Sequence, residues 1–306
     1  MISYNRIGWL DVAKGITIIL MVLGHTSIPK EISNWIWSFH MPLFFIASGL
    51  TTNWSRESFS KFVIKKTNSI IRPFIGYSLV LSLMLWQFQI DHPYSKILTG
   101  WGGYALWFVP VLFVALIIAK IFFIMSGRVR YCYLMILPAI SYLLCYYEFH
   151  FSWNMSVVPY AAMFIIIGSY IKWHVKKIQN ASWWSMILFL IVTLIISHFW
   201  HLDMCYNKII PMMPLTIGAI CGTLFIFIMS IYTEKYIPVL SKIFQSVGRE
   251  TFLILAFSQI IIQIINVYMG FNVILKYLFL FVILIFAKYI KDMVSKMCRN
   301  LIKNKV

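Results

Sequence analysis

Ten apolar segments, each close to the length that crosses a lipid bilayer as a helix, dominate this sequence. A membrane-spanning helix needs about 20 predominantly apolar residues. Hydrophobic residues make up 61% of the 306-residue chain and charged residues 11%, whereas soluble domains average about 45–50% and about 25%. These values exclude a disordered chain and a soluble globular domain. We therefore predict an all-α integral membrane protein, a bundle of about ten transmembrane helices near residues 8–27, 35–52, 69–90, 104–125, 131–147, 155–173, 183–199, 209–231, 250–268 and 271–291.

The 26 Lys and Arg residues fall mostly on one side of these predicted helices. With the N-terminus placed in the cytoplasm, 22 of them lie on the inner side, and the outer four are Lys30, Lys96, Lys208 and Lys276. Cytoplasmic loops of membrane proteins are enriched in Lys and Arg. The distribution predicts that both termini are cytoplasmic and that the protein lies in the cell (inner) membrane. It also explains the net charge of +17 without a nucleic-acid partner.

The chain is expected to form one transmembrane domain over residues 1–306, without an appended soluble domain. Its first apolar run is too long for a secretory signal peptide, and Asp11 and Lys14 interrupt the start of that run. The five cysteines form no Cys-x-x-Cys pair, so we predict neither a disulfide framework nor a zinc site.

Three ionisable residues, Asp11, Lys14 and His25, lie in the first predicted span. Placing an ionisable group within the membrane costs free energy, so each of these residues is a candidate functional residue. On a helix, Lys14 and His25 fall within about 20° of each other and about 16 Å apart along the axis, and Asp11 lies about 40° from His25. One stripe of the helix therefore links a cytoplasmic cation to a histidine in the outer half. The alternative is structural: Lys14 extends to the membrane surface beside Asp11, and His25 bonds to a neighbouring helix.

A second histidine, His40, opens the next predicted span within the run SFHMPLFF at 38–45. The two spans are antiparallel neighbours joined by a short loop, so we expect His25 and His40 to converge near the outer side. Imidazole titrates near neutral pH, which suits proton transfer. His25, His40 and Asp11 are therefore the candidate catalytic residues, and a structural histidine bonded to a carbonyl is the alternative for His40.

A cluster of cations, Lys65, Lys66 and Arg72, approaches the third predicted span from the cytoplasm. Such a cluster suits phosphate groups. Together with Lys14 it forms the candidate site for a phosphate-bearing cofactor. The positive-inside rule and contact with anionic lipid explain the same charges without a ligand.

Polar residues also gather in the predicted outer loops. His198, His201 and Asp203 have a spacing that could ligate a metal, but nothing supplies a fourth ligand, so no metal site is predicted. Other outer-loop residues of this kind are Asp91, His92, Glu148 and His150. Exposed loop polarity explains them individually, and together they could line an outward cleft for a hydroxylated acceptor.

Two motifs in the first two spans resemble those of the acyltransferase family 3 membrane O-acyltransferases. They are DVAKGI at 11–16, followed by Gly24-His25, and FHMPLFFIASG at 39–49. The run LWFVP at 106–110 is similar to a signature of the short sugar O-acetylase members, and Gly168 and Gly248 with TFLIL at 251–255 fit more loosely. The resemblance covers essentially the whole chain.

The resemblance implies a ten-helix bundle that moves an acyl group, usually acetyl, from cytoplasmic acyl-CoA to a carbohydrate hydroxyl. His25 matches the family's essential histidine and Lys14 a basic position on the same helix. Lys66 matches the first position of a paired-arginine motif, whose second position is Ser69 here, and Arg72 is expected to supply the missing charge. A histidine often found in the ninth span is replaced by Ser258, followed by Gln259. These replacements are departures from the family pattern.

The sequence thus predicts a membrane O-acetyltransferase that uses acetyl-CoA and a glycan or lipid-linked sugar acceptor, with membrane lipid as its surroundings. His25 would act as a general base or as a transient acyl carrier. The alternative is a transporter or flippase of a polar or lipid-linked substrate, in which Asp11, Lys14 and His25 relay protons. Transporters often contain repeated halves, and we detect no such repeat.

Overall fold

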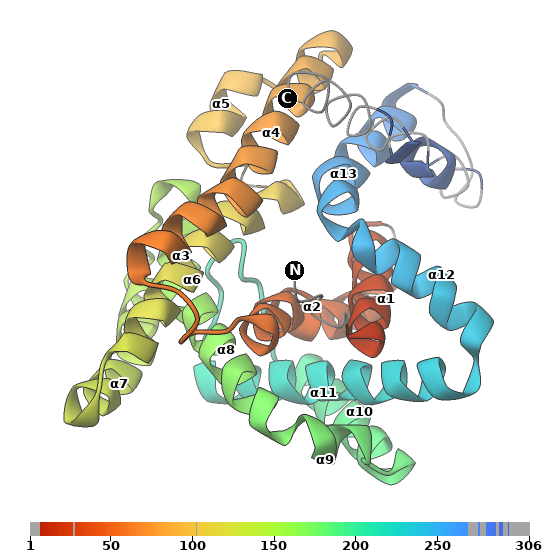
Figure 1. The fold of residues 1–306 in the computed structure, drawn as a ribbon. Coiled ribbons are helices and arrows are strands. Elements are labelled where there is room, and N and C mark those ends of the chain that lie inside the picture. The colour runs from red at the N-terminus through yellow and green to blue at the C-terminus, as the bar shows by residue number, and fades with distance from the viewer. Residues whose placement is uncertain are drawn as a thin grey trace, which may run out of the picture.

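The computed structural model describes residues 7–26, 28–101, 103–268, 275, 280–285, 288–289 and 293. Over these residues the regular structure is helical, apart from one isolated antiparallel bridge between Asp203 and Lys208. The α-helices (Figure 1) are α1 (Gly8–Gly24), α2 (Lys30–Thr51), α3 (Phe59–Lys66), α4 (Arg72–Phe88), α5 (Pro93–Leu98), α6 (Phe108–Ile124), α7 (Gly127–Tyr146), α8 (Val158–Ile171), α9 (Val175–Gln179), α10 (Trp183–Phe199), α11 (Met212–Tyr236), α12 (Pro238–Arg249) and α13 (Thr251–Tyr268). A π-helical turn, η1 (Thr67–Ile71), joins α3 to α4, and the 3₁₀ turns are η2 (Ala105–Trp107), η3 (Ser152–Val157) and η4 (Lys172–His174).

Six helical runs of the described residues are long and apolar enough to cross a membrane, so the chain is a multi-pass membrane protein. They are Phe59–Phe88, Ala105–Ile124, Gly127–Tyr146, Ser152–Gln179, Met212–Tyr236 and Thr251–Tyr268. Helices α1, α2 and α10 coincide with three more of the predicted spans but are shorter or more polar. The predicted span near 271–291 lies largely outside the described residues. The ten-helix bundle and the cytoplasmic termini stay predictions, and "inner" and "outer" below refer to that predicted orientation.

Helices α1 and α2 lie at the centre of the molecule, with the other helices around them (Figure 1). Helix α2 packs mainly on α8 and α11, and α1 packs most extensively on α12. Sequence patterning does not predict α12 (Pro238–Arg249), which falls between the predicted spans 209–231 and 250–268. Helix α12 is amphipathic and has 12 residues, well below the length of a membrane span. A search for long apolar runs therefore does not detect it.

Glycines allow two pairs of helices to cross with their backbones in contact. A Cβ atom on Gly248 of α12 would overlap the carbonyl oxygen of Asp11 in α1, and one on Gly15 of α1 would overlap that of Phe244 in α12. The pair Gly49 and Gly168 does the same for α2 and α8. Small residues permit this close approach of helices in membranes. Both crossings fix the helices that carry the candidate site.

The loop after α2 is tied to the surrounding helices at the inner end. Lys120 of α6 is 3% exposed, and its Nζ donates to the carbonyl oxygens of Trp54 and Glu57. Lys172 donates from Nζ to the carbonyl oxygen of Thr52 at 3.3 Å. These lysines therefore pair with backbone carbonyls of the 52–57 loop, which holds the start of α3 against the bundle.

Candidate active site

Helix α1 carries two of the predicted site residues at opposite ends. Lys14 lies in its second turn, and His25 directly follows its last helical residue. The helix rises about 16 Å between them. Lys14 lines a cavity on the inner side, and His25 lines a separate pocket on the outer side.

The outer pocket, called here the histidine pocket, brings His25 and His40 together. Both rings contact Trp37: the ring centroids are 5.4 Å apart for His25 and 6.1 Å apart for His40. The pocket is small, about 30 Å³. Its lining residues come from α1, α2, the η2 turn and the loop before α11, namely His25, Trp37, His40, Met41, Ala105, Trp107, Leu202, Asp203, Met204 and Cys205.

His40 is buried, at 5% exposure, in the middle of α2. Its Nδ1 lies 3.0 Å from the carbonyl oxygen of Ile36. A carbonyl only accepts hydrogen bonds, so this contact assigns the proton to Nδ1 and leaves Nε2 of the neutral ring as an acceptor. A ring held in this tautomer can receive a proton at Nε2.

The loop from α10 to α11 closes the histidine pocket. His201 lies against Trp37, with ring centroids 5.5 Å apart, and Asp203 lines the pocket beside the histidines. Burial lowers the pKa of His201 and raises the pKa of Asp203. His198 lies apart from the pocket, exposed at the end of α10 with its ring against Phe199.

Asp11 lies at the inner end of α1, about 21 Å along the helix axis from His25. Its side chain is only 4% exposed and lies between two cations, 3.4 Å from Lys14 Nζ and 3.8 Å from Arg249 Nε. The structure therefore groups Asp11 with Lys14 and not with the two histidines.

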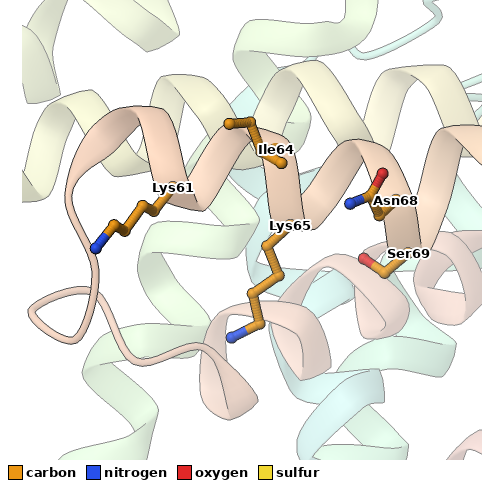
Figure 2. A pocket seen from close by; sticks show the side chains of 5 residues that line it. All are labelled: Lys61, Ile64, Lys65, Asn68 and Ser69. Atoms are coloured by element: carbon orange, nitrogen blue, oxygen red, sulfur yellow. The ribbon is translucent and has the colours of Figure 1, made fainter. Parts of the chain in front are cut away.

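A basic pocket of about 490 Å³ lies on the exposed face of α3 and the π turn. It is lined by Lys61, Ile64, Lys65, Asn68 and Ser69, and Figure 2 shows these side chains along one side of the helical run. Lys65 Nζ lies 2.5 Å from Glu57 Oε1, and this hydrogen bond lowers the pKa of the Glu57 carboxyl.

The other two predicted cofactor-binding cations line neither the basic pocket nor the inner cavity. Lys66 is directed toward Phe62, with Nζ 5.5 Å from the ring centroid, and Arg72 is exposed at the start of α4. The π turn explains the placement of Arg72, because a π turn holds more residues than an α turn and shifts everything after it around the helix. Arg72 therefore does not follow Ser69 on the face that α-helical spacing predicts.

An inner cavity of about 230 Å³ lies beside the basic pocket, and Ser69 lines both. Hydroxyl groups and one cation line part of it, namely Lys14, Ser48, Thr51, Ser69 and Thr251. The remaining lining residues are apolar: Phe44, Ala47, Ile70, Phe108, Val109, Leu112, Phe252 and Leu255. A charged ligand head in the basic pocket could thus extend an uncharged arm past Ser69 into the bundle.

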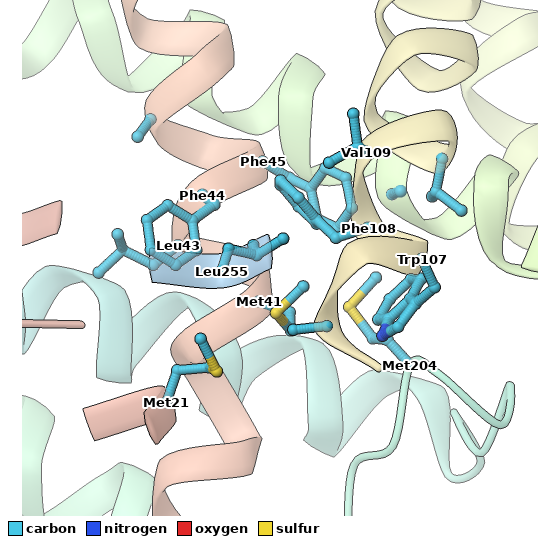
Figure 3. Close-up of a cluster of buried hydrophobic side chains, with 14 of the residues drawn as sticks. Met21, Met41, Leu43, Phe44, Phe45, Trp107, Phe108, Val109, Met204 and Leu255 are labelled. Atoms are coloured by element: carbon cyan, nitrogen blue, oxygen red, sulfur yellow. The ribbon is translucent and has the colours of Figure 1, made fainter. Parts of the chain in front are cut away.

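One layer of apolar side chains separates the inner cavity from the histidine pocket. Phe44 and Phe108 face the cavity, and Met41 and Trp107 line the histidine pocket. Phe44 lies one turn, about 4.5 Å, along α2 from Met41, and Trp107 precedes Phe108 directly. Figure 3 shows these four side chains in one cluster. We call them the aromatic layer.

A sequence model of the family described as "Acyltransferase domain" matches residues 7–292. The chain belongs to acyltransferase family 3. This match confirms the resemblance that the motifs of the first two spans suggested, and it covers every element of the site described above. No curated protein and no solved structure matches the chain.

The pockets of this acyltransferase are also lined by residues that the sequence did not single out, among them Lys61, Asn68 and Trp37. Lys61, Lys65, Asn68 and Ser69 recur at intervals of four, three and one, a spacing that indicates one helix face, and it could have identified the basic pocket. No comparable spacing identifies Trp37 as a pocket residue. Tryptophans near the ends of membrane spans are expected as interface anchors, so its position alone does not set it apart.

Helix α13 holds the turn that lines the histidine pocket of the acyltransferase. Gln259 Oε1 accepts a hydrogen bond from the Ala105 backbone N–H, and Gln263 Oε1 accepts one from Tyr104 Oη at 2.7 Å. Ser258, where the family often has a histidine, is fully buried. The ninth predicted span thus positions the LWFVP segment. Among the described residues no group of three or more His, Cys, Asp or Glu side chains is arranged to hold a metal ion.

Proposed function

We propose that this acyltransferase moves an acetyl group from cytoplasmic acetyl-CoA to a hydroxyl of a cell-surface polysaccharide or its lipid-linked precursor. It does so within the cell (inner) membrane. The observation that carries the proposal is the placement of a basic pocket, an inner cavity and a histidine pocket in succession, with only the aromatic layer between the last two.

The donor enters from the inner side. Coenzyme A carries several phosphate charges, and Lys61 and Lys65 supply charge-assisted hydrogen bonds in a pocket open to water. Its flexible thioester arm is uncharged and passes Ser69 into the inner cavity. Lys14, held by Asp11, lies along this route. This assigns Asp11 a positioning role at the donor end.

The transfer needs a base because a sugar hydroxyl is a weak nucleophile at neutral pH. In the direct route, the His25 imidazole takes the hydroxyl proton while the oxygen attacks the thioester carbonyl carbon. The carbon–sulfur bond breaks, the thiolate leaves, and the imidazolium returns the proton to it. In the two-step route a nitrogen of His25 attacks the thioester carbon and the carbon–sulfur bond breaks, so that coenzyme A leaves as the thiolate; the sugar oxygen then attacks the acetyl-imidazole, the carbon–nitrogen bond breaks, and the hydroxyl proton passes to the second histidine. His40, fixed by its bond to Ile36, is the second proton carrier.

The test is coenzyme A release by the purified protein in lipid or detergent, with acetyl-CoA and crude cell-envelope glycan. We expect release that needs the glycan and that His25→Ala abolishes. Trp173→Ala is the control, because Trp173 is 83% exposed and lines none of the three pockets.

Two results would contradict the proposal. Release that His25→Ala leaves unchanged would remove His25 from the chemistry. Failure of the folded wild type to bind any acyl-CoA would exclude the donor and favour a transporter or flippase.

A further inference from the structure

A second outer pocket, called here the loop pocket, lies beside the histidine pocket. Its volume is about 310 Å³. Thr99 after α5, the segment 150–157 between α7 and α8, and residues 204–207 before α11 form it. Met204 and Cys205 line both pockets. Met204 and Cys205 therefore separate a group held in the loop pocket from the pocket that contains His25 and His40.

Hydrogen bonds within and between these loops hold the loop pocket together. Asn154 Nδ2 donates to the carbonyl oxygen of Cys205, which joins the second loop to the third. The Phe151 N–H donates to Ser156 Oγ at 2.8 Å. The Tyr206 N–H donates to Asp203 Oδ1 at 3.2 Å, and Asp203 itself lines the histidine pocket. The shape of the loop pocket is thus coupled to that of the histidine pocket.

The lining of the loop pocket has the chemistry that recognises an uncharged, hydroxyl-rich ligand. Its polar side chains are those of Thr99, His150, Ser152, Asn154, Ser156 and Asn207. None of the residues that line it in the described structure is Lys, Arg, Asp or Glu. Hydroxyl and amide groups both donate and accept hydrogen bonds, as sugar hydroxyls do. Phe151 and Tyr206 add aromatic surface for the apolar face of a sugar ring.

The side chain of Asn207 independently indicates a ligand site. The residue is 5% exposed and lines the loop pocket. Neither Oδ1 nor Nδ2 of its amide has a hydrogen-bond partner in the described part of the chain. A buried amide without partners is unfavourable, and such groups in native structures usually await a ligand or water. One amide offers two donors and one acceptor, which suits adjacent hydroxyls of one sugar ring.

We propose that the loop pocket binds one uncharged sugar unit of the acceptor and that Asn207 recognises its hydroxyls. The proposal rests on the proposed function and names the substrate class of the same site. The bound unit presents a hydroxyl across Met204 and Cys205 to the histidine pocket. Charged sugars are disfavoured, because the described lining contains no Lys, Arg, Asp or Glu to pair with them.

Two measurements test the proposal separately from the transfer chemistry. Ligand-observed NMR without acetyl-CoA measures binding of the methyl glycosides of glucose, galactose and N-acetylglucosamine, with glucuronic acid and N-acetylneuraminic acid as charged probes. Coenzyme A release then gives KM for each bound glycoside and for acetyl-CoA. The variants are Asn207→Asp, which keeps the shape but removes both donors, and Asn207→Gly, which suits the left-handed backbone of this residue (φ 53°).

We expect at least one neutral glycoside to bind, and both variants to weaken its binding and raise its KM at least tenfold. KM for acetyl-CoA should not change. The control is Asn34→Ala, an amide at the same outer end, in α2, that lines none of the pockets described. Any of three results would overturn the proposal. They are no binding of any neutral glycoside, an unchanged KM for the glycoside in both Asn207 variants, and tighter binding of the charged sugars than of the neutral ones. Glycoside binding that depends on Asn207 without any coenzyme A release would support the sugar site and contradict the transfer reaction.

Discussion

The two ends of the bundle are built in different ways. At the inner end, helices meet backbone to backbone at glycines, as Gly49 and Gly168 do, and the basic pocket lies on one face of one helical run. At the outer end, loops close the pockets, and residues 203–208 form the only β-bridge of the described structure. The inner end is therefore a rigid frame with charges on its surface, and the outer end is an assembly of segments distant in sequence.

This difference matches the two substrates we propose. A donor with several phosphates needs accessible charge, which one helix face provides. An acceptor hydroxyl needs a confined base and a shaped pocket, which separate segments must build together. The difference also predicts which substitutions alter turnover, which alter folding and which alter donor binding.

The largest effect is expected at the outer end, from the two histidines. His25→Ala and His40→Ala should each lower kcat for coenzyme A release by about 10²–10⁴, because each removes a proton carrier from the histidine pocket. If the rings act as one unit around Trp37, the double variant should lose little more than the worse single variant. Steady-state kinetics of all four proteins measures this.

Acetyl-CoA binding is the control for these variants, since both histidines lie beyond the aromatic layer from the basic pocket. A dissociation constant that rises in parallel with the loss of kcat would show that the outer end also binds the donor. That result would contradict the assignment of donor binding to the inner end and of proton transfer to the outer end.

The next effect concerns the inner frame. In Gly49→Ala the new Cβ would overlap the carbonyl oxygen of Ile165, and such overpacking typically costs about 1–3 kcal/mol. Gly76→Ala is the matched control, because a Cβ on Gly76 of α4 meets no atom within 4 Å; removing a helical glycine there should stabilise by about 0.4–1 kcal/mol.

Thermal unfolding in detergent measures both glycine variants. We expect a lower midpoint for Gly49→Ala and an unchanged or higher one for Gly76→Ala. Equal midpoints would mean that α2 and α8 separate easily, and that the inner end is not a rigid frame.

Sequence reasoning succeeded where the signal was local and failed where it depended on assembly. Membrane class and the family follow from apolar runs and short motifs. The pairing of Lys14 with Asp11, which the sequence offered as the structural alternative, is local to one helix. The sequence prediction for Arg72 assumed uniform α-helical spacing. The π turn before Arg72 breaks that spacing and places the residue on another face of the helix. Trp37 and Asn207 carry no local signal, since the pockets that they line are formed by segments brought together from separate parts of the chain.

A smaller effect is expected from the basic pocket. The double change of Lys61 and Lys65 to Gln should raise KM for acetyl-CoA about tenfold, because hydrogen bonds to charged groups contribute about 1.5–3 kcal/mol each when buried and less when exposed. KM for acetyl-pantetheine, which lacks these phosphates, should stay constant. Lys176→Gln, at an exposed position of α9 outside the pocket, is the control.

Glu57 provides a way to sharpen that experiment. Its Oε1 lies 2.5 Å from Lys65 Nζ and would compete with a phosphate group for that cation, so Glu57→Gln should lower KM for acetyl-CoA a few-fold. An equal rise of KM for both donors in the lysine variant would assign those lysines to the membrane surface rather than to phosphate.

The smallest effect tests the boundary between the two ends. Phe108→Leu removes one ring of the aromatic layer. The centroid of this ring lies 4.7 Å from that of Phe45 and 6.0 Å from that of Phe44. Water from the histidine pocket should then reach the thioester, and acetyl-CoA hydrolysis without an acceptor should rise a few-fold. Phe122→Leu is the matched control, since Phe122 lies on the same helix, is fully buried and lines neither cavity. Equal hydrolysis in the two variants would show that loosening α6 is sufficient, and that the layer does not separate donor from water. A rise confined to Phe108→Leu, with glycan-dependent transfer retained, would place the thioester directly behind this ring.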